Sequence, residues 1–336
     1  MFFTECCVYD RDSNTTLLYY QTNEIVSELV VCDLSGNVIK SSITGNHSRK
    51  TDKCILIKDD IVWENCEYVK TYRIKMKLNR GSDYKVDTVL DLKYPFEKCA
   101  LNLDKDRSAI ISTMCRNYYH RLDEWIDYNL RLGFSGIVIF NNDENKRHFI
   151  NEGGTHNVYT TDMKNLIEKY GNKLTVVNFP YSSIESNWNS IQRISLTIGA
   201  QAYKNKCRNI AFIDPDEFIH ISVNPTMKIE DFLQRYQNAI NMSSNLLTNR
   251  SNEDIIDNNV LEIAKYVGPD KYKKVIIYTQ RYKTEFIMTP HNYPGETVLS
   301  KDVIVHYHSW LNDRLVYDED MIEFNGLQTL MSSSTR

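Results

Sequence analysis

Two aspartates in the stretch Phe212-Ile213-Asp214-Pro215-Asp216-Glu217 have the residue type and spacing that suit a metal ion. Side chains alternate along an extended chain, so Asp214 and Asp216 point the same way and can share one cation. Pro215 stiffens the backbone between them. Hard carboxylate oxygens favour Mg²⁺ or Mn²⁺, and Mg²⁺ is commonly shared with substrate phosphates. We therefore predict a metal site that serves a nucleotide-diphosphate substrate.

The Asp-x-Asp pattern is a weak signal by itself. It occurs three more times in the chain, at Asp10/Asp12, Asp104/Asp106 and Asp318/Asp320. Only Asp214 follows a continuous apolar run, residues 210–213, as the end of an interior parallel strand should. The alternative interpretation makes Asp214 and Asp216 turn residues at the end of a strand.

Histidines recur after the acidic stretch, at His291, His306 and His308. A single imidazole added to two carboxylates suits Mn²⁺. His306 and His308 fall on one face of an expected strand, while His291 belongs to a loop. For each of them, an ordinary hydrogen-bonded structural role is the alternative.

The elements that must position these residues begin near residue 108. Strands are expected at 109–114, 136–140, 174–179 and 210–213, and helices at 118–132, 163–170 and 186–203. This alternation predicts an α/β domain around a parallel sheet. Right-handed crossovers would bring the polar residues that follow these strands to one edge, where such sheets bind ligands.

The chain before and after this region follows other patterns. Residues 1–105 are expected to form a small β-rich domain, with apolar and basic residues alternating along 72–78. Residues 106–317 are expected to form the α/β domain, and 318–336 a C-terminal tail. Within the second domain, 241–259 is polar and is expected to be a long loop, and the stretches 274–278, 285–288 and 303–308 are expected to be closing strands.

Composition narrows the class of protein. The 336 residues carry a formal net charge of −4, which disfavours nucleic acid as the main partner. No apolar stretch has the length of a membrane helix, and the first residues lack the pattern of a signal peptide. We therefore expect a cytoplasmic protein without an integral membrane segment, whose eight cysteines are reduced.

Four segments in chain order carry a resemblance to a known family. They are residues 114–134, Ile139-Phe140-Asn141-Asn142-Asp143, Ile213-Asp214-Pro215-Asp216-Glu217-Phe218 and His306-Tyr307-His308-Ser309. Together they resemble GT-A glycosyltransferases of family 2 and family 92 type. The resemblance implies a Rossmann-like GT-A fold with a mainly parallel sheet, a nucleotide-sugar donor, and Mn²⁺ or Mg²⁺ at the acidic stretch.

The resemblance also implies roles for particular residues. Asp216 becomes the firmest metal ligand, and Asp214 approaches the metal and the donor. The late histidine ligand of the family corresponds to His291 or His306. The positions that contact the nucleotide or face the donor are Arg116, Asn117, Asn141, Asp143, Gln192 and Arg193. The usual Asn-Glu pair after the first strand is Asn117-Tyr118 in this chain.

An inverting transfer, which the resemblance implies, needs a carboxylate base to take a proton from the acceptor hydroxyl. Glu285 lies where that base is expected, and Asp270 is the second candidate. For each of them, the alternative role is that of an ordinary carboxylate on the surface. Glu217 would orient the acceptor. Five basic residues lie between positions 271 and 283, and they either contact the diphosphate or form a solvated face of the protein. They are Lys271, Lys273, Lys274, Arg281 and Lys283.

The leading hypothesis is therefore a metal-dependent glycosyltransferase that moves a sugar from a nucleotide-diphosphate sugar to a carbohydrate or glycoprotein acceptor. A metal-dependent phosphodiesterase or nucleotidyltransferase would use the same carboxylates but needs further acidic ligands for a second metal. A non-catalytic glycan-binding protein is the third hypothesis.

Overall fold

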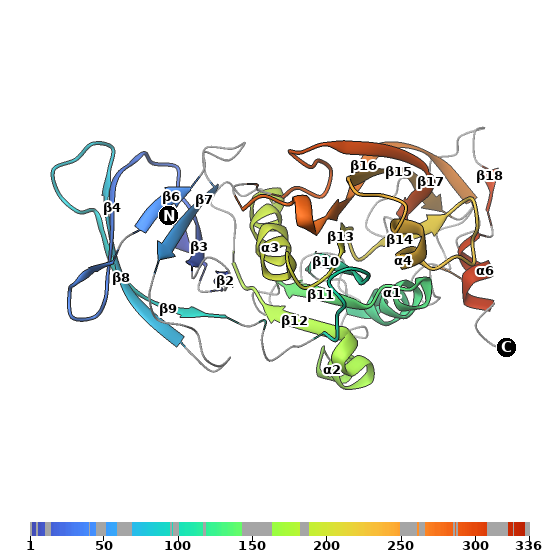
Figure 1. Ribbon diagram of the computed structural model, residues 1–336, viewed down its shortest axis with the longest axis horizontal. Coiled ribbons are helices and arrows are strands. Elements are labelled where there is room, and N and C mark those ends of the chain that lie inside the picture. The colour runs from blue at the N-terminus through green and yellow to red at the C-terminus, as the bar shows by residue number, and fades with distance from the viewer. Residues whose placement is uncertain are drawn as a thin grey trace, which may run out of the picture. The chain divides into compact units, whose positions relative to one another are not determined.

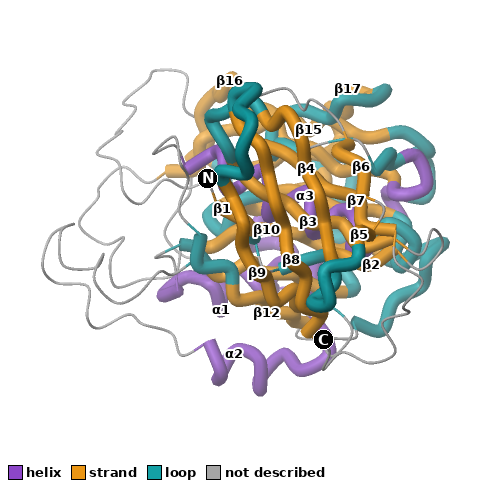
Figure 2. The backbone as a smooth tube through the Cα atoms, turned by 90° about the vertical axis from the view of Figure 1, so that its left-hand side faces the viewer, coloured by secondary structure: helices purple, strands orange, loops and turns teal. Residues whose placement is uncertain are grey.

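The computed structural model describes most of the chain, and its elements are drawn in Figure 1 and Figure 2. The described residues are 2–4, 6–10, 15–39, 41–44, 52–58, 69–94, 96, 101–116, 119–142, 163–181, 188–248, 261, 266–284, 286, 288–307, 322–324 and 326–332. The chain divides into two compact units. The first comprises Met1–Ala100, Phe179–Tyr203 and Lys283–Met288, and the second comprises Leu101–Asn178, Lys204–Tyr282 and Thr289–Arg336.

The first unit contains two antiparallel sheets. One has the order β1-β3-β7-β6, with β2 paired to β3. Its strands are β1 (Phe2–Phe3), β2 (Val8–Asp10), β3 (Thr15–Gln21), β6 (Ser41–Thr44) and β7 (Asp52–Lys58). The other has the order β5-β4-β8-β9. Its strands are β4 (Val26–Cys32), β5 (Val38–Ile39), β8 (Val69–Leu78) and β9 (Val86–Lys93). The expected β-rich character of the first hundred residues is therefore confirmed.

Strand β8 has one buried and one wet face, as its alternating sequence predicts. Its apolar side chains at 72, 74, 76 and 78 are buried. On the other face, Arg73 contacts Asp87 at 2.7 Å and Lys77 contacts Glu28 at 2.6 Å. Such exposed ion pairs add little stability, and here they neutralise most of the basic stripe.

Helix α3 (Trp188–Tyr203) belongs to the first unit by its contacts, although it follows the α/β elements in sequence. Its Thr197 hydroxyl accepts a hydrogen bond from the Met288 backbone N–H at 2.8 Å. Tyr203 packs edge-on against Phe96, with ring centroids 5.9 Å apart. The division predicted from the sequence, at residues 105 and 317, stays a prediction.

The second unit is built on one mixed sheet of nine strands, in the order β12-β11-β10-β13-β16-β15-β17-β14 with β18 paired to β16. The strands are β10 (Ala109–Cys115), β11 (Gly136–Asn141), β12 (Leu174–Asn178), β13 (Asn209–Phe212), β14 (Glu217–Ile221), β15 (Ala239–Thr248), β16 (Tyr266–Tyr278), β17 (Thr297–Tyr307) and β18 (Ile322–Glu323). The helices are α1 (Tyr119–Leu132), α2 (Met163–Tyr170), η3 (Gly171–Lys173), α4 (Ile229–Leu233), η4 (Thr279–Arg281) and α6 (Gly326–Ser332). No helix of the described residues is long and apolar enough to cross a membrane.

The strands and helices expected between 109 and 213 are confirmed to within about two residues. Strands β12, β11, β10 and β13 are parallel neighbours. The predicted class, a Rossmann-like GT-A fold with a mainly parallel sheet, is wrong. From β13 onward β16, β15, β17 and β14 extend the sheet, and only the β15–β17 pair among them is parallel. Periodicity identifies a strand but not its partner or direction, because distant pairing sets both.

The polar stretch 241–259 is a second correction. The sequence predicts a loop, but residues 239–248 form β15, which lies between β16 and β17 in the sheet, and residues 249–259 lie outside the described residues. Ile240, Met242 and Leu246 are buried, while Asn241, Ser243 and Asn245 between them are half-buried. This period of two indicates a strand, and the Asn- and Ser-rich composition concealed it.

Helix α1 is anchored to β14 by two buried aromatic side chains. Trp125 Nε1 donates to the Glu217 carbonyl at 2.7 Å, and the Tyr128 hydroxyl donates to the Ile219 carbonyl at 2.7 Å. Trp125 and Tyr128 are three residues apart and lie on one face of the helix. Glu217 and Ile219 are two residues apart, so their carbonyls point to the same side of the strand. Gly133 follows the last residue of the helix at φ 105°, a backbone conformation that favours glycine and ends the helix. The helix thus fixes the strand that begins at Glu217.

We expect Tyr128→Phe to lower the free energy of unfolding by about 1–2 kcal/mol, because it removes a hydrogen bond from a buried carbonyl. Urea unfolding, followed by tryptophan fluorescence, measures this loss. Tyr278→Phe is the matched control in the same unit, since it removes an exposed hydrogen bond to Gln280. Equal losses for the two variants would contradict the anchoring role.

Candidate metal centre

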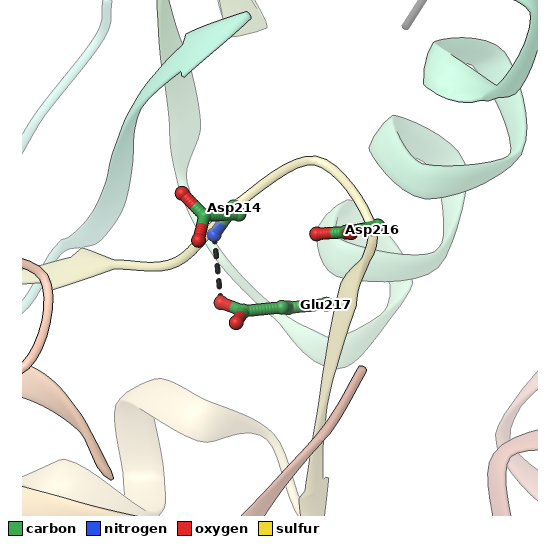
Figure 3. A group of neighbouring side chains, drawn as sticks. All are labelled: Asp214, Asp216 and Glu217. Carbon is green, nitrogen blue, oxygen red and sulfur yellow. Dashed lines mark hydrogen bonds between the residues drawn. The ribbon is translucent and has the colours of Figure 1, made fainter. Parts of the chain in front are cut away.

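Three carboxylates gather at the turn between β13 and β14. β13 ends at Phe212 and β14 begins at Glu217, whose backbone N–H donates to the Asp214 carbonyl at 3.0 Å. Ligand atoms of Asp214, Asp216 and Glu217 all lie within 4.8 Å of one another. Figure 3 shows the Asp216 and Glu217 side chains projecting into the concave side of this turn. Asp214 and Asp216 lie close together as expected, but they lie in a turn at the end of β13 and not on an extended segment, and Glu217 joins them.

A buried lysine from another strand completes the cluster. Lys274 lies on β16, and its side chain is only 2% exposed. Its Nζ is 2.5 Å from Asp214 Oδ2 and 2.9 Å from Glu217 Oε1. Glu217 Oε2 in turn accepts the Asp214 backbone N–H at 2.7 Å. Lys274, Asp214 and Glu217 therefore form a closed ring of contacts.

Burial and mutual repulsion make the carboxylates hold protons more tightly than usual. Removal from water, together with the neighbouring Asp214 carboxylate, raises the pKa of Asp216 to about 7. Burial raises the pKa of Glu217 to about 8, against the opposing effect of Lys274. Burial disfavours the Lys274 ammonium, but Asp214 and Glu217 outweigh it and raise the pKa of Lys274. The lysine therefore stays charged at neutral pH.

The donor set fits a hard divalent cation. All three candidate ligands are carboxylates, which suit Mg²⁺ or Mn²⁺ better than softer metals. Glu217 has both oxygens in contact with Lys274 or the Asp214 N–H. Within the described part of the chain, no lysine or arginine forms a salt bridge with Asp216. Asp216, assisted by Asp214, is therefore the ligand most available to a metal, and Glu217 supports Asp214.

Two of the predicted nucleotide contacts lie at the same edge of the sheet as Asp214. Arg116 directly follows β10 and Asn141 ends β11, and both are half-buried. The neighbouring Asn142 is fully buried, and its backbone N–H donates to the Cys115 carbonyl at 2.9 Å. Because β10, β11 and β13 are parallel, their carboxyl ends share one edge. Asn117 and Asp143 lie outside the described residues.

Gln192, Arg193 and His291 are the other predicted site residues whose side chains the structure describes. Gln192 and Arg193 lie on α3 in the first unit, each 4% exposed, and their role toward a donor stays a prediction. His291 Nδ1 lies 2.9 Å from the Lys273 carbonyl oxygen. Among the described residues, the group that could hold a metal contains the three carboxylates and not His291.

Three further predicted residues are only partly placed or not placed. His306 is on β17 opposite Phe218 in register, and Asp270 is on β16; their side chains are outside the described part of the structure. Glu285 also lies outside the described residues. The identity of the base and of a histidine ligand therefore stays a prediction.

Lys274 is the residue whose role the sequence did not single out. The sequence places it among five basic residues that either contact a diphosphate or form a solvated face. The available signal was its position directly before Val275-Ile276-Ile277, at the start of the buried part of a strand. A lysine inside an apolar run needs a buried partner of opposite charge, and the acidic turn is such a partner.

Comparisons with known proteins add little to this description. No protein-family model matches the chain, and no curated protein matches it. A β-glucuronidase from Ruminococcus gnavus, in complex with C6-substituted uronic isofagomine, is similar at TM-score 0.21 and 7% identity over 61% of this chain and 35% of that one. Bifidobacterium dentium β-glucuronidase, complexed with coumarin-3-O-glucuronide, reaches TM-score 0.21 and 13% identity over 61% and 35% of the two chains. The chain spans about a third of the length of these proteins, and likeness at this TM-score carries no argument about its fold or function.

We expect Mn²⁺ to bind more tightly as the pH rises toward about 7, because the metal must displace the proton from Asp216. Below this pKa, affinity should rise by up to about tenfold per pH unit, and above it the affinity should level off. Isothermal titration with Mn²⁺ between pH 5.5 and pH 8 measures this. An affinity that is constant over that range would contradict the raised pKa of Asp216.

Proposed function

We propose that this chain is a metal-dependent glycosyltransferase that moves a sugar from a nucleotide-diphosphate sugar to a carbohydrate or glycoprotein acceptor. The observation that carries the proposal is the carboxylate pair Asp214 and Asp216, held at the carboxyl end of β13 beside the ends of β10 and β11. The resemblance of four ordered segments to GT-A glycosyltransferases supports the reaction class. This proposal concerns the reaction and not the fold.

The residues at the turn would have two different roles, metal binding and positioning of a metal ligand. Asp216 and Asp214 would hold the cation, and Glu217 with Lys274 fixes the direction of the Asp214 carboxylate. A divalent cation bound there would neutralise the charge that builds on a nucleoside diphosphate as it leaves. Arg116, at the end of β10, would add a guanidinium for the diphosphate at the same edge of the sheet.

One observation disfavours a two-metal phosphodiesterase or nucleotidyltransferase. Such chemistry needs enough carboxylates to hold two cations about 4 Å apart. The acidic group of the described residues has three members, and two of them already share the Lys274 ammonium. This charge balance suits one divalent cation.

The reaction can be tested with a panel of UDP-, GDP- and TDP-sugars in the presence of Mn²⁺. A glycosyltransferase acting on water or on a sugar acceptor releases a nucleoside diphosphate, whereas a phosphodiesterase releases a nucleoside monophosphate. Chromatography of the nucleotide products separates the two. We expect a nucleoside diphosphate from at least one donor and no turnover in EDTA; monophosphate alone, or full activity in EDTA, would contradict the proposal.

We expect Asp216→Asn to lower the turnover rate by at least about 100-fold, because it removes the carboxylate most available to the metal. Asp106→Asn is the matched control, since Asp106 is an exposed member of another Asp-x-Asp triplet. Initial rates under saturating donor and Mn²⁺ measure both variants. Similar rates for Asp216→Asn and the wild-type protein would exclude Asp216 as a metal ligand.

A further inference from the structure

Lys274 is a charged residue in the centre of a mixed sheet. Its side chain is 2% exposed, and in the register of β16 with β15 it pairs with Met242 of β15. A lysine is almost never buried to this degree unless it is paired, because removal of its charge from water is costly. Both of its carboxylate partners, Asp214 and Glu217, belong to the metal turn. The lysine is therefore tied to the site and not to the general core.

The contacts of Lys274 separate the three carboxylates into two kinds. Asp214 and Glu217 share the ammonium, and Glu217 also binds the Asp214 backbone N–H. Figure 3 shows Asp216 on the same limb of the turn as Glu217, without a hydrogen bond to either of the other two carboxylate residues. Without the ammonium, three carboxylates within 4.8 Å of one another would repel, and the turn would open or take up protons.

We propose that Lys274 is a positioning residue that acts as a built-in counter-cation, which holds the turn assembled without a metal and limits how tightly a divalent cation binds. This inference rests on the metal site of the proposed function. The ammonium stabilises two carboxylates, but it also repels any second cation beside them. Coulomb repulsion is strong at separations of a few ångströms in a partly buried site.

The charge argument makes predictions that differ in sign between variants. Lys274→Met keeps the length of the side chain but removes the repelling charge, so a divalent cation should bind more tightly and replace the lost ammonium. At a pH above about 8, where the Glu217 carboxylate is ionised, Glu217→Gln removes a negative charge and leaves Lys274 less neutralised, so the cation should bind more weakly. Lys274→Arg keeps the charge and should resemble the wild-type protein. A purely structural role would weaken metal binding in both neutral variants.

Thermal unfolding of the full chain, with Mn²⁺ as the probe and no nucleotide present, tests these predictions. In EDTA we expect the Tm of Lys274→Met to fall by roughly 6 °C or more, since the buried Glu217 and the half-buried Asp214 lose their partner. Mn²⁺ should recover most of that loss, with a midpoint concentration on the order of tenfold lower than for the wild-type protein. Glu217→Gln should need on the order of tenfold more Mn²⁺.

The results separate this inference from the proposed function. Mn²⁺ binding that is unchanged or weaker in Lys274→Met would overturn the inference, as would a failure of both the wild type and this variant to respond to Mn²⁺. If Lys274→Met does not fold, tighter Mn²⁺ binding by Glu217→Gln would overturn it alone, and weaker binding would support it. The expected shifts without any nucleotide-sugar turnover would contradict the glycosyltransferase and leave the role of Lys274 intact.

Discussion

The arrangement of the acidic turn depends on the contact of one buried ammonium, that of Lys274, with the carboxylates of Asp214 and Glu217. Lys274 reaches the turn after β13 only because β16 pairs antiparallel with β13, with Val275 opposite Phe212 in register. A shift of one residue would place the lysine on the other face of the sheet. From the other side, α1 holds β14 through Trp125 and Tyr128. The acidic turn is therefore fixed by a strand on one side and by a helix on the other.

This arrangement explains how three carboxylates remain close together in a partly buried position. Each desolvated charge is unfavourable alone, and the raised pKa values of Asp216 and Glu217 express that cost. The ring of Lys274, Asp214 and Glu217 offsets part of it, while Asp216 keeps no salt bridge among the described residues. In the proposed metal site, Asp216 and Asp214 would hold the cation, while Glu217 and Lys274 would keep Asp214 in place.

Local patterns in the sequence predicted the local structure of this region. The strands and helices from 109 to 213 follow from hydrophobic periodicity, whereas Asp214 and Asp216 come together through a turn and not through the alternation of an extended chain. The mixed sheet and the role of Lys274 were missed because they depend on pairing between distant strands, and β15 was missed because its Asn- and Ser-rich composition resembles that of a loop. The identity of Lys274 as a partner of Asp214 requires knowledge that β16 lies beside β13, 60 residues away in sequence. Spacing along the chain contains no such information.

The central claim is that a divalent cation binds at Asp214 and Asp216. Anomalous diffraction from a crystal of the protein soaked in Mn²⁺ tests it most directly, because the scattering locates the ion without any assumption about activity. The account predicts one strong peak within about 2.5 Å of a carboxylate oxygen of Asp216, with Asp214 beside it and Lys274 still in contact with Glu217. A peak only elsewhere, such as at His291, or no ordered peak at the turn, would contradict the account.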